Sequence, residues 1–366
     1  MANKKTLSQK IKETKPEESK RVVEVYPDAV QTLANREEIR KAAKNGNLHK
    51  AKEAKSDEFY TLLETVEAEL MHYRPHFKGK IVLCNCDDPA ESNFFRYFAL
   101  NFSFLGLKKL ISTHYEPNGK SYALIVDNTL DVNGDGKIDI KDTLKVELEG
   151  NGDFRSPECI KYLNECDIVC TNVPFSLARE YLDVVKKAKK KFLFIGNRNM
   201  ITYKDFFEEI KNNRLWLGVI PMSCTWFRVP QDEAYRKEGN RFKIENGIWY
   251  RSLGNACWFT NLMHKKRNLP LDLVGSEYSP EKYPKFDNYN VIEVSKVSDI
   301  PDGYKGVMAV PITFLDKYNP EQFEIVSCND YRVNDQIPFK SHGLIKDKEG
   351  TINGKPTYVR ICIKAK

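Results

Sequence analysis

Hydrophobic and polar positions change their pattern twice along the chain. Residues 1–45 are rich in charged side chains and poor in aromatic ones, so we expect a basic, partly disordered N-terminal extension there. Over 46–225, short apolar runs alternate with stretches whose apolar residues recur at helical spacing. Over 226–366, strand-like runs dominate. The pattern therefore predicts an extension, an α/β core and a β-rich part, in that order.

Strand and helix patterns alternate regularly in the middle stretch. The runs Lys80–Cys84 and Lys109–His114 indicate buried strands, and the apolar stretch from Phe94 indicates a helix that ends at Gly106. Asp88 is expected to cap this helix, with a proline in its first turn. Further helices are predicted over 156–165 and 176–191, and further strands over 166–171 and 192–197. Such alternation is typical of a parallel sheet with helices on both faces, so the predicted fold class is α/β.

Composition narrows the class of protein. Hydrophobic residues make up 41% of the chain and charged residues 30%, which is ordinary for a soluble globular protein. We find no apolar run of about 18 residues and no apolar signal core near the first residue, so we expect neither a membrane span nor secretion. The nine cysteines form no CxxC pair, which favours a reduced, cytoplasmic compartment.

Positive charge is concentrated at the start of the chain. The formal net charge is +7, and residues 1–55 carry 14 Lys and Arg against 8 Asp and Glu. The remainder is therefore close to neutral. A basic extension is compatible with a polyanionic partner, and a solvated tail is the competing interpretation.

One short motif, TNVPFS at 171–176, follows an apolar strand directly. Ligands bind beyond the carboxyl ends of strands in a doubly wound sheet, so we expect Asn172 to project into a cleft. An Asn oxygen and the backbone carbonyl of Val173 can accept both hydrogens of an adenine amino group, which frees the nitrogen lone pair for reaction. Pro174 stiffens the loop, and Phe175 offers a face on which a flipped base can stack. The alternative is a plain strand-to-helix turn.

A second motif, DVNGDGKIDIKD at 131–142, fits an EF-hand-like calcium loop. Its last ligand is Asp rather than Glu, and the segment before it looks like a strand. Turns rich in Asp, Asn and Gly are common, so a tight turn without metal is the competing interpretation. Bound calcium would have a structural role. The expected ligands are Asp131, Asn133, Asp135, Ile138 and Asp142.

The second half of the chain mixes basic and aromatic residues. Phosphate contacts and base stacking use such mixtures, although alternating aromatic and basic residues also fit an amphipathic strand. Two strands, Ile248–Leu253 and Cys257–Leu262, are expected to be joined by a turn. The mixed set comprises Trp226, Phe227, Arg228, Arg241, Lys243, Trp249, Tyr250, Arg251, Lys265, Lys266 and Arg267.

The motif TNVPFS resembles motif IV of amino-methyltransferases, (D/N/S)-P-P-(Y/F/W). Other segments follow in matching order, among them AKSDEFYT, VLCNCDDPAESNFFRYF, GNGDFRSPECI, ACWFTNL and GVMAVPITFLDKYNPEQFEIV. From about Asn47 to Lys364 the chain resembles the EcoRI-type adenine-specific DNA methyltransferases. This resemblance implies a Rossmann-like class I methyltransferase sheet, S-adenosylmethionine as cofactor, and methylation of N6 of adenine in double-stranded DNA. The oligomeric state stays open, with a monomer favoured.

The resemblance also assigns roles to residues. Residues 46–225 would form the catalytic core that binds the cofactor, and 226–366 would complete the sheet and contribute to DNA target recognition. The target base would lie against Asn172, Val173, Pro174 and Phe175. The cofactor contacts would be Phe59, Tyr60 and Thr61 near the start, Asn85, Asp87 and Asp88 at the methionine end, Glu116 at the ribose hydroxyls, and Asp153 and Phe154 at the adenine.

Two departures from the family pattern keep alternatives open. The loop CNCDDP lacks the glycines usual in methyltransferases, and Val173 stands where the DNA enzymes usually have proline. Ribosomal-RNA adenine dimethyltransferases carry N-(I/L/V)-P-(Y/F), so an RNA adenine N6-methyltransferase is one alternative. A catalytically degenerate DNA-binding protein is the other.

Overall fold

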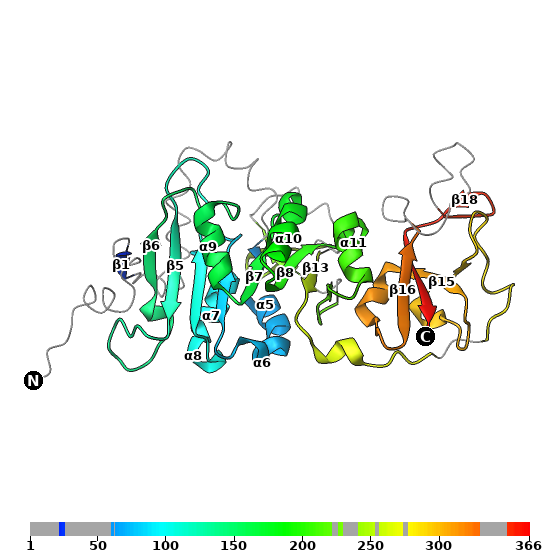
Figure 1. The fold of residues 1–366 in the computed structure, drawn as a ribbon, viewed down its shortest axis with the longest axis horizontal. Coiled ribbons are helices and arrows are strands. Elements are labelled where there is room, and N and C mark those ends of the chain that lie inside the picture. Colours follow the sequence, from blue (N-terminus) through cyan, green and yellow to red (C-terminus); the bar gives the residue numbers. More distant parts are fainter. Residues whose placement is uncertain are drawn as a thin grey trace, which may run out of the picture. The chain divides into compact units, whose positions relative to one another are not determined.

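A computed structural model of the chain describes residues 22–25, 60–61, 63–221, 226–229, 241–252, 256–273, 277–329 and 350–366 (Figure 1). The chain divides into two compact units. The first unit comprises Met1–Gly196 and Ser223–Trp258, and the second comprises Asn197–Met222 and Phe259–Lys366. The boundaries 1–45, 46–225 and 226–366 stay a prediction.

Four parallel strands form the centre of the sheet in the first unit. The strand β3 (Ile81–Cys84) pairs in parallel with β4 (Lys109–Thr113) on one side and with β7 (Ile168–Asn172) on the other. In turn, β7 pairs in parallel with β8 (Lys191–Asn197). Every residue of β3, β4 and β7 is buried, as expected for a parallel sheet covered on both faces. A mixed α/β fold with a central parallel sheet is thus confirmed.

Antiparallel strands extend this sheet beyond β4, and β13 lies next to β8 in the strand order. The flank follows the order β4, β5, β6 and β1. On the other side of the sheet, the last two residues of β13 pair with β9. Those two residues and β9 belong to the second unit. The flanking strands are β5 (Tyr122–Asp127), β6 (Leu144–Glu147), β1 (Val22–Val25), β13 (Ala256–Thr260) and β9 (Trp216–Leu217).

The helices of the first unit bury aromatic side chains against the sheet and each other. Phe94 meets Trp258 edge to face at 5.7 Å between ring centroids, and Phe77 meets Phe98 at 5.0 Å. All four rings are buried, so they fill the core between helix and sheet. The α-helices are α5 (Leu63–Leu70), α6 (Arg74–Phe77), α7 (Asn93–Leu100), α8 (Phe102–Leu105), α9 (Pro157–Glu165) and α10 (Ala178–Lys187).

The predicted helix after β3 begins later than expected. Asp88 is not its N-cap, because the chain makes a further turn before α7. Instead the hydroxyl oxygen of Ser92 accepts hydrogen bonds from the backbone N–H groups of Phe94 and Phe95. The expected end is confirmed, since Gly106 takes up a left-handed conformation (φ 63°) after α8.

A second sheet of the first unit has the strand order β11, β12, β10, β2. The predicted turn before Cys257 joins strands of two different sheets, because β12 belongs to this sheet and β13 to the larger one. Residues 253–255 of that turn lie outside the described residues. The four strands are β11 (Phe242–Glu245), β12 (Ile248–Ser252), β10 (Trp226–Arg228) and β2 (Tyr60–Thr61).

The second unit contains a four-stranded sheet and one α-helix among its described residues, α11 (Lys204–Lys211). Strand order is β14 (Ile292–Glu293), β15 (Val307–Pro311), β19 (Arg360–Ala365) and β16 (Phe323–Cys328). A short hairpin of β17 (Thr351–Ile352) and β18 (Lys355–Pro356) lies before β19. The short 3₁₀ helices of the two units are η2 (Met71–Tyr73), η3 (Ile140–Asp142), η4 (Phe175–Leu177), η5 (Arg198–Thr202), η8 (Lys265–Asn268), η9 (Val297–Asp299) and η10 (Ile312–Lys317).

Among the described residues we find no helix that is both long and apolar enough to cross a membrane.

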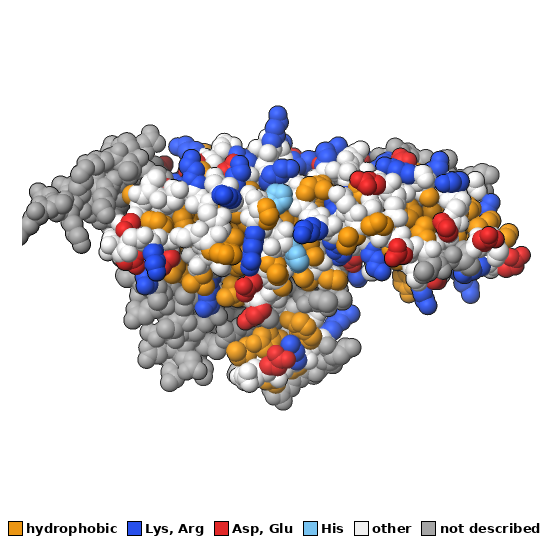
Figure 2. All heavy atoms as spheres, turned by 90° about the horizontal axis from the view of Figure 1, so that it is seen from below, with side chains coloured by type: hydrophobic (Ala, Val, Ile, Leu, Met, Phe, Trp, Pro, Cys, Tyr) orange, Lys and Arg blue, Asp and Glu red, His pale blue; other side chains and the backbone are white. Residues whose placement is uncertain are grey.

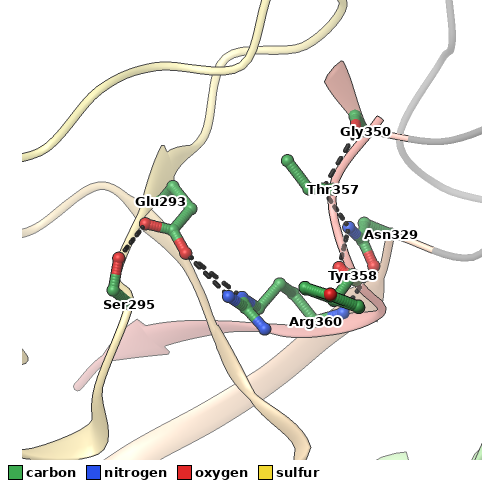
Figure 3. A network of polar contacts seen from close by, with 7 residues as sticks. All are labelled: Glu293, Ser295, Asn329, Gly350, Thr357, Tyr358 and Arg360. Carbon is green, nitrogen blue, oxygen red and sulfur yellow. Dashed lines mark hydrogen bonds and ion pairs between the residues drawn. The ribbon is translucent and has the colours of Figure 1, made fainter. Parts of the chain in front are cut away.

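A partly buried polar network, centred on Glu293 and Asn329, holds the strands of the second unit in register (Figure 3). The Glu293 carboxylate on β14 accepts from the Arg360 guanidinium on β19 at 2.9 Å and from the Ser295 hydroxyl at 2.8 Å. After β16, the Asn329 side chain donates to the Thr357 hydroxyl (3.2 Å) and accepts from the backbone N–H of Arg360 (2.5 Å). These bonds join strands that are far apart in the sequence, so they specify how β19 enters the sheet.

Removing one partner of the buried Glu293–Arg360 pair should destabilise the protein strongly. Both side chains are at most 16% exposed, so Arg360→Met would leave a buried carboxylate without its cation. We expect a loss of about 3–5 kcal/mol in the free energy of unfolding, measured by chemical denaturation. The exposed pair of Lys187 and Asp183 provides the control, because Lys187→Met should cost about 0–1 kcal/mol. Equal losses in the two variants would contradict a structural role for the buried pair.

Candidate functional site

The loop after β3 is tied to the end of β7. The backbone N–H of Cys86 donates to the hydroxyl oxygen of Thr171 at 3.1 Å. The side chain of Asn85 is buried, and its Oδ1 accepts from the Tyr181 hydroxyl at 2.7 Å. Two segments about 85 residues apart in the chain therefore meet at one edge of the sheet.

Two carboxylates follow in the same loop. Asp87 accepts a hydrogen bond from the Ser92 hydroxyl at 3.0 Å, which fixes the loop against the start of α7. Asp88 accepts from the Tyr122 hydroxyl at 3.4 Å and lies 3.8 Å from Nε2 of His114. The rings of His114 and Tyr122 stack with centroids 4.9 Å apart. Asp88 therefore faces the end of β4 rather than the start of the helix.

The loops after β4 and β6 pack closely on each other. The backbone N–H of Glu116 donates to the carbonyl of Asn151 at 2.8 Å. Gly152 has a φ of +78°, and a Cβ at this position would lie 1.8 Å from the carbonyl oxygen of His114. Only glycine can make so close an approach. The half-buried Glu116 is thereby held beside the segment that carries Asp153 and Phe154.

Asp153 and Phe154 are each engaged by a neighbouring side chain. The Arg155 guanidinium donates to both carboxylate oxygens of Asp153, at 2.9 and 2.7 Å, and to Glu180 at 2.5 Å. These hydrogen bonds lower the pKa of Asp153 below its ordinary value, so the carboxylate is ionised at neutral pH. The Phe154 ring is buried and meets the Tyr181 ring edge to face at 5.2 Å.

The motif at 172–175 lies where the sequence predicts it. Asn172 is the last residue of β7 and is 8% exposed, and Val173 is buried behind it. Pro174 and Phe175 are half-buried, and Phe175 begins the single-turn helix η4 that leads into α10. An amide side chain therefore stands at the carboxyl end of a central parallel strand, where ligands of such sheets bind.

These residues form a coherent set of groups for a nucleoside cofactor. Because β3, β4 and β7 run in parallel, their carboxyl ends lie along one edge and bring the predicted contacts after each strand together. Carboxylates at 116 and 153 can accept hydroxyl or amino hydrogens, and Phe154 offers an apolar surface. Because Gly152 has no Cβ, its backbone can lie against the carbonyl of His114, which holds the loops that carry Glu116 and Asp153 together. The residues present therefore fit S-adenosylmethionine.

The structure describes only part of the three predicted cofactor contacts near the start of the chain, Phe59, Tyr60 and Thr61. Tyr60 and Thr61 form β2, which pairs antiparallel with Phe227 and Arg228 of β10. Their side chains and the whole of Phe59 lie outside the described residues. The role of this segment stays a prediction.

The structure does not support the predicted calcium site. The carboxylate of Asp142 accepts from the backbone N–H groups of Val132 (2.8 Å) and Asp139 (3.0 Å), and that of Asp131 accepts from Gly134 (2.6 Å). Asn133 and Asp135 hydrogen-bond within the same turn, and the carbonyl oxygen of Ile138 accepts from the Ser103 hydroxyl at 2.6 Å. No group of three or more acidic, His or Cys side chains in the described part of the chain could hold a metal. The motif builds a turn from side-chain acceptors.

The basic residues of the second half lie in two kinds of environment, one on the face of a sheet and one buried among aromatic rings. Lys243 on β11 lies 4.7 Å from the Trp226 ring and 5.4 Å from the Tyr250 ring, on one face of the second sheet. Arg267 is 5% exposed and lies over the rings of Trp216 (4.4 Å) and Tyr318 (5.2 Å) in the second unit. Burial lowers the pKa of Arg267 to about 10. Arg267 is therefore a packing residue and not a surface contact.

Figure 2 shows one face of the molecule, on which basic side chains are spread among hydrophobic and acidic ones.

Tyr181 is the residue of this region that sequence reasoning missed. It touches Asn85 and Phe154, two predicted cofactor contacts, from the helix that follows the motif. The available signal was a tyrosine in the apolar stripe of α10, which also contains Ala178, Leu182 and Val185. A buried tyrosine hydroxyl requires a hydrogen-bond partner, so its place in that stripe points to a polar contact in the core.

Known proteins match the chain over most of its length. It is 47% identical to the Type II methyltransferase M.EcoRI of Escherichia coli over 339 residues, which cover 88% of this chain and 98% of the relative. It is 40% identical to the Type II methyltransferase M.MpnI of Mycoplasma pneumoniae over 325 residues, which cover 86% of this chain and 97% of the relative. No solved structure matches the chain.

A family model described as adenine-specific methyltransferase EcoRI matches residues 47–366. The match includes the loop after β3, the segment at 151–154 and the motif at 172–175, which the fold brings to one edge of the sheet. Membership in a methyltransferase family implies the use of S-adenosylmethionine. This chain belongs to the EcoRI family of adenine-specific methyltransferases.

Proposed function

We propose that this adenine-specific methyltransferase transfers a methyl group from S-adenosylmethionine to N6 of adenine within a specific sequence of double-stranded DNA. One observation carries the proposal. The hydrogen bond from Cys86 to Thr171 joins the loop assigned to the cofactor to the strand that ends at Asn172. A methyl donor and an acceptor base must meet for direct transfer, and these two segments adjoin.

The cofactor would be held by side chains from three loops. Bound S-adenosylmethionine supplies an activated methyl group on a sulfonium centre. Glu116 would accept the ribose hydroxyls, and Asp153 with Phe154 would hold the adenine. An ionised Asp153 keeps lone pairs for an amino hydrogen besides those used by Arg155. The methionine end would be held by Asn85, Asp87 and Asp88, and the N-terminal contacts would come from Phe59, Tyr60 and Thr61.

The target base would be activated by hydrogen-bond acceptors at the end of β7. The lone pair of an adenine amino group is delocalised into the ring, so the nitrogen is a poor nucleophile. Asn172 and the carbonyl of Val173 would accept its two hydrogens, which favours a tetrahedral nitrogen and localises the lone pair. Pro174 would limit the motion of the loop, and Phe175 would stack on the flipped base.

The comparisons favour DNA over RNA as substrate. Both relatives are named Type II methyltransferases, and the match extends over nearly their whole length. A catalytically degenerate binder is disfavoured because the motif residues stand at the end of a central parallel strand, tied to the loop that carries the proposed contacts Asn85, Asp87 and Asp88.

In the sheet formed by β11, β12, β10 and β2, the face that carries Trp226, Lys243 and Tyr250 would contact DNA. Lys243 is opposite Tyr250 in the pairing of β11 with β12, and Trp226 is opposite Ser252 in the pairing of β10 with β12. Residues 250 and 252 share one face, so the cation and both rings lie on that face. A cation between aromatic rings can contact a phosphate while the rings pack against sugars or bases.

Asn172→Ala should abolish methyl transfer while leaving cofactor binding intact. Loss of a preorganised acceptor lowers kcat by about 100-fold or more. Transfer is measured as incorporation of labelled methyl into adenine-containing duplexes, and cofactor affinity by calorimetry. The exposed Asn164 on α9 gives a matched control, since Asn164→Ala removes an amide remote from the motif. Near-normal turnover of Asn172→Ala would remove the motif from the active site.

Glu116→Ala and Asp153→Ala should each weaken cofactor binding by about 1–3 kcal/mol and leave DNA affinity unchanged. Each variant deletes an acceptor for a donor of the cofactor. Arg155→Met is the control for Asp153, because it removes the ion pair and keeps the carboxylate. Calorimetry should show a larger loss for Asp153→Ala than for Arg155→Met. Unchanged affinity in both acidic variants would overturn the assignment of the cofactor site.

Lys243→Met should weaken DNA binding equally for all sequences and reduce its salt dependence. Loss of one phosphate contact lowers the slope of log K against log salt by about one unit. Binding is measured by fluorescence anisotropy over a series of salt concentrations. Lys187→Met, on an exposed position of α10, is the charge-matched control. If both variants keep the wild-type slope, the DNA lies elsewhere.

A further inference from the structure

Helix α10 carries two adjacent residues that reach the two sides of the proposed cofactor site. Glu180 accepts from Arg155 at 2.5 Å, and Arg155 in turn holds Asp153. Tyr181 donates its hydroxyl to Oδ1 of Asn85 at 2.7 Å. The helix begins at Ala178, immediately after the single turn that starts at Phe175 of the motif.

These two connections differ in strength. The Arg155–Glu180 pair is 45% and 55% exposed, so water screens it and it constrains the site weakly. Tyr181 is fully buried, and its ring also meets Phe194 of β8 edge to face at 5.9 Å. Burial raises the pKa of Tyr181 well above its ordinary value, so its hydroxyl stays a donor throughout the usual pH range. The buried connection is therefore the one that can fix geometry.

We propose that Tyr181 is a positioning residue that orients Asn85 and Phe154 for cofactor binding. The Tyr181 hydroxyl donates to Oδ1 of Asn85, which fixes the orientation of the amide. The Nδ2 group on the other side of the amide is a donor. The methionine end of S-adenosylmethionine carries a carboxylate, which accepts such a donor. At the same time the Tyr181 ring sets the plane of Phe154, 5.2 Å away at 71°. One side chain thus holds contacts for both ends of the cofactor.

The inference rests on the proposed function, and its test separates the two. Tyr181→Phe keeps the ring and removes the bond to Asn85. We expect the Kd for S-adenosylmethionine, measured by calorimetry on the full chain, to rise about three- to tenfold, the effect of one buried hydrogen bond. Asn85→Ala should also raise the Kd. Added to Asn85→Ala, Tyr181→Phe should have no further effect, because residues that act through one contact are not additive.

Tyr73→Phe provides the matched control. Tyr73 is also fully buried and donates to Glu69 over 2.7 Å, in α5 and η2, which contribute no proposed contact. It should lower the thermal midpoint about as much as Tyr181→Phe does and leave the Kd unchanged. A rise in Kd for both variants would mean that general destabilisation, and not positioning, explains the effect.

Two further results would overturn the inference. If the wild-type chain binds S-adenosylmethionine and the Tyr181→Phe variant binds it with the same Kd, the positioning role is refuted and the proposed function stays intact. Fully additive effects of Tyr181→Phe and Asn85→Ala would show that the hydroxyl does not act through the amide. A wild-type chain that binds no S-adenosylmethionine would refute the proposed cofactor site itself.

Discussion

Parallel pairing of β3 with β4 and β7 is the constraint on which the candidate site depends. Side chains that follow three strands reach the same edge only because those strands point the same way. A register that matches Cys84 with Ser112 ends β3 and β4 almost level. The loops that follow can then meet across short distances, as the close approach of Gly152 to His114 shows. The chemistry assigned to this edge is therefore a consequence of the fold.

The loop after β3 reaches its shape without the glycines usual in methyltransferases. No residue from 85 to 92, all of them described, has a positive φ. The turn is built by side chains instead, with Asp88 accepting from the backbone N–H of Ala90 and Asp87 from Ser92. Such acceptors stabilise a turn in residues that keep ordinary backbone angles. The absence of a glycine-rich signature therefore does not argue against a cofactor loop.

Local patterns predicted elements well and their connections poorly. Strand β3 and helix α9 were expected within one residue of their observed bounds, because their apolar runs are continuous and well delimited. The N-cap at Asp88 was wrong because Asp88 and Ser92 are both capping types, and only the turn between them decides which one serves. The calcium prediction finds no support in the structure for a related reason, since metal loops and Asx turns use the same residues.

The sequence predicted the motif of the candidate site, but not the residues that hold the site residues in place. Asn172 was placed because it follows an apolar strand, a feature of the local sequence. The bond from Tyr181 to Asn85 spans 96 residues and depends on the packing of α10 against the sheet. No periodicity within either segment encodes such a contact. Residues that hold other residues are thus found from the structure, whereas the proposed substrate contacts form a motif in the sequence.

Burial of Val173 bears on whether the motif is still that of an enzyme. Proline at this position would limit the loop through its ring, which fixes φ. Val173 is 1% exposed, and a β-branched side chain packed in the core has little rotamer freedom left. Pro174 follows it and restricts its backbone to extended conformations. Packing on one side and a following proline on the other supply the rigidity that the missing ring would have given, so the substitution does not by itself indicate a degenerate site.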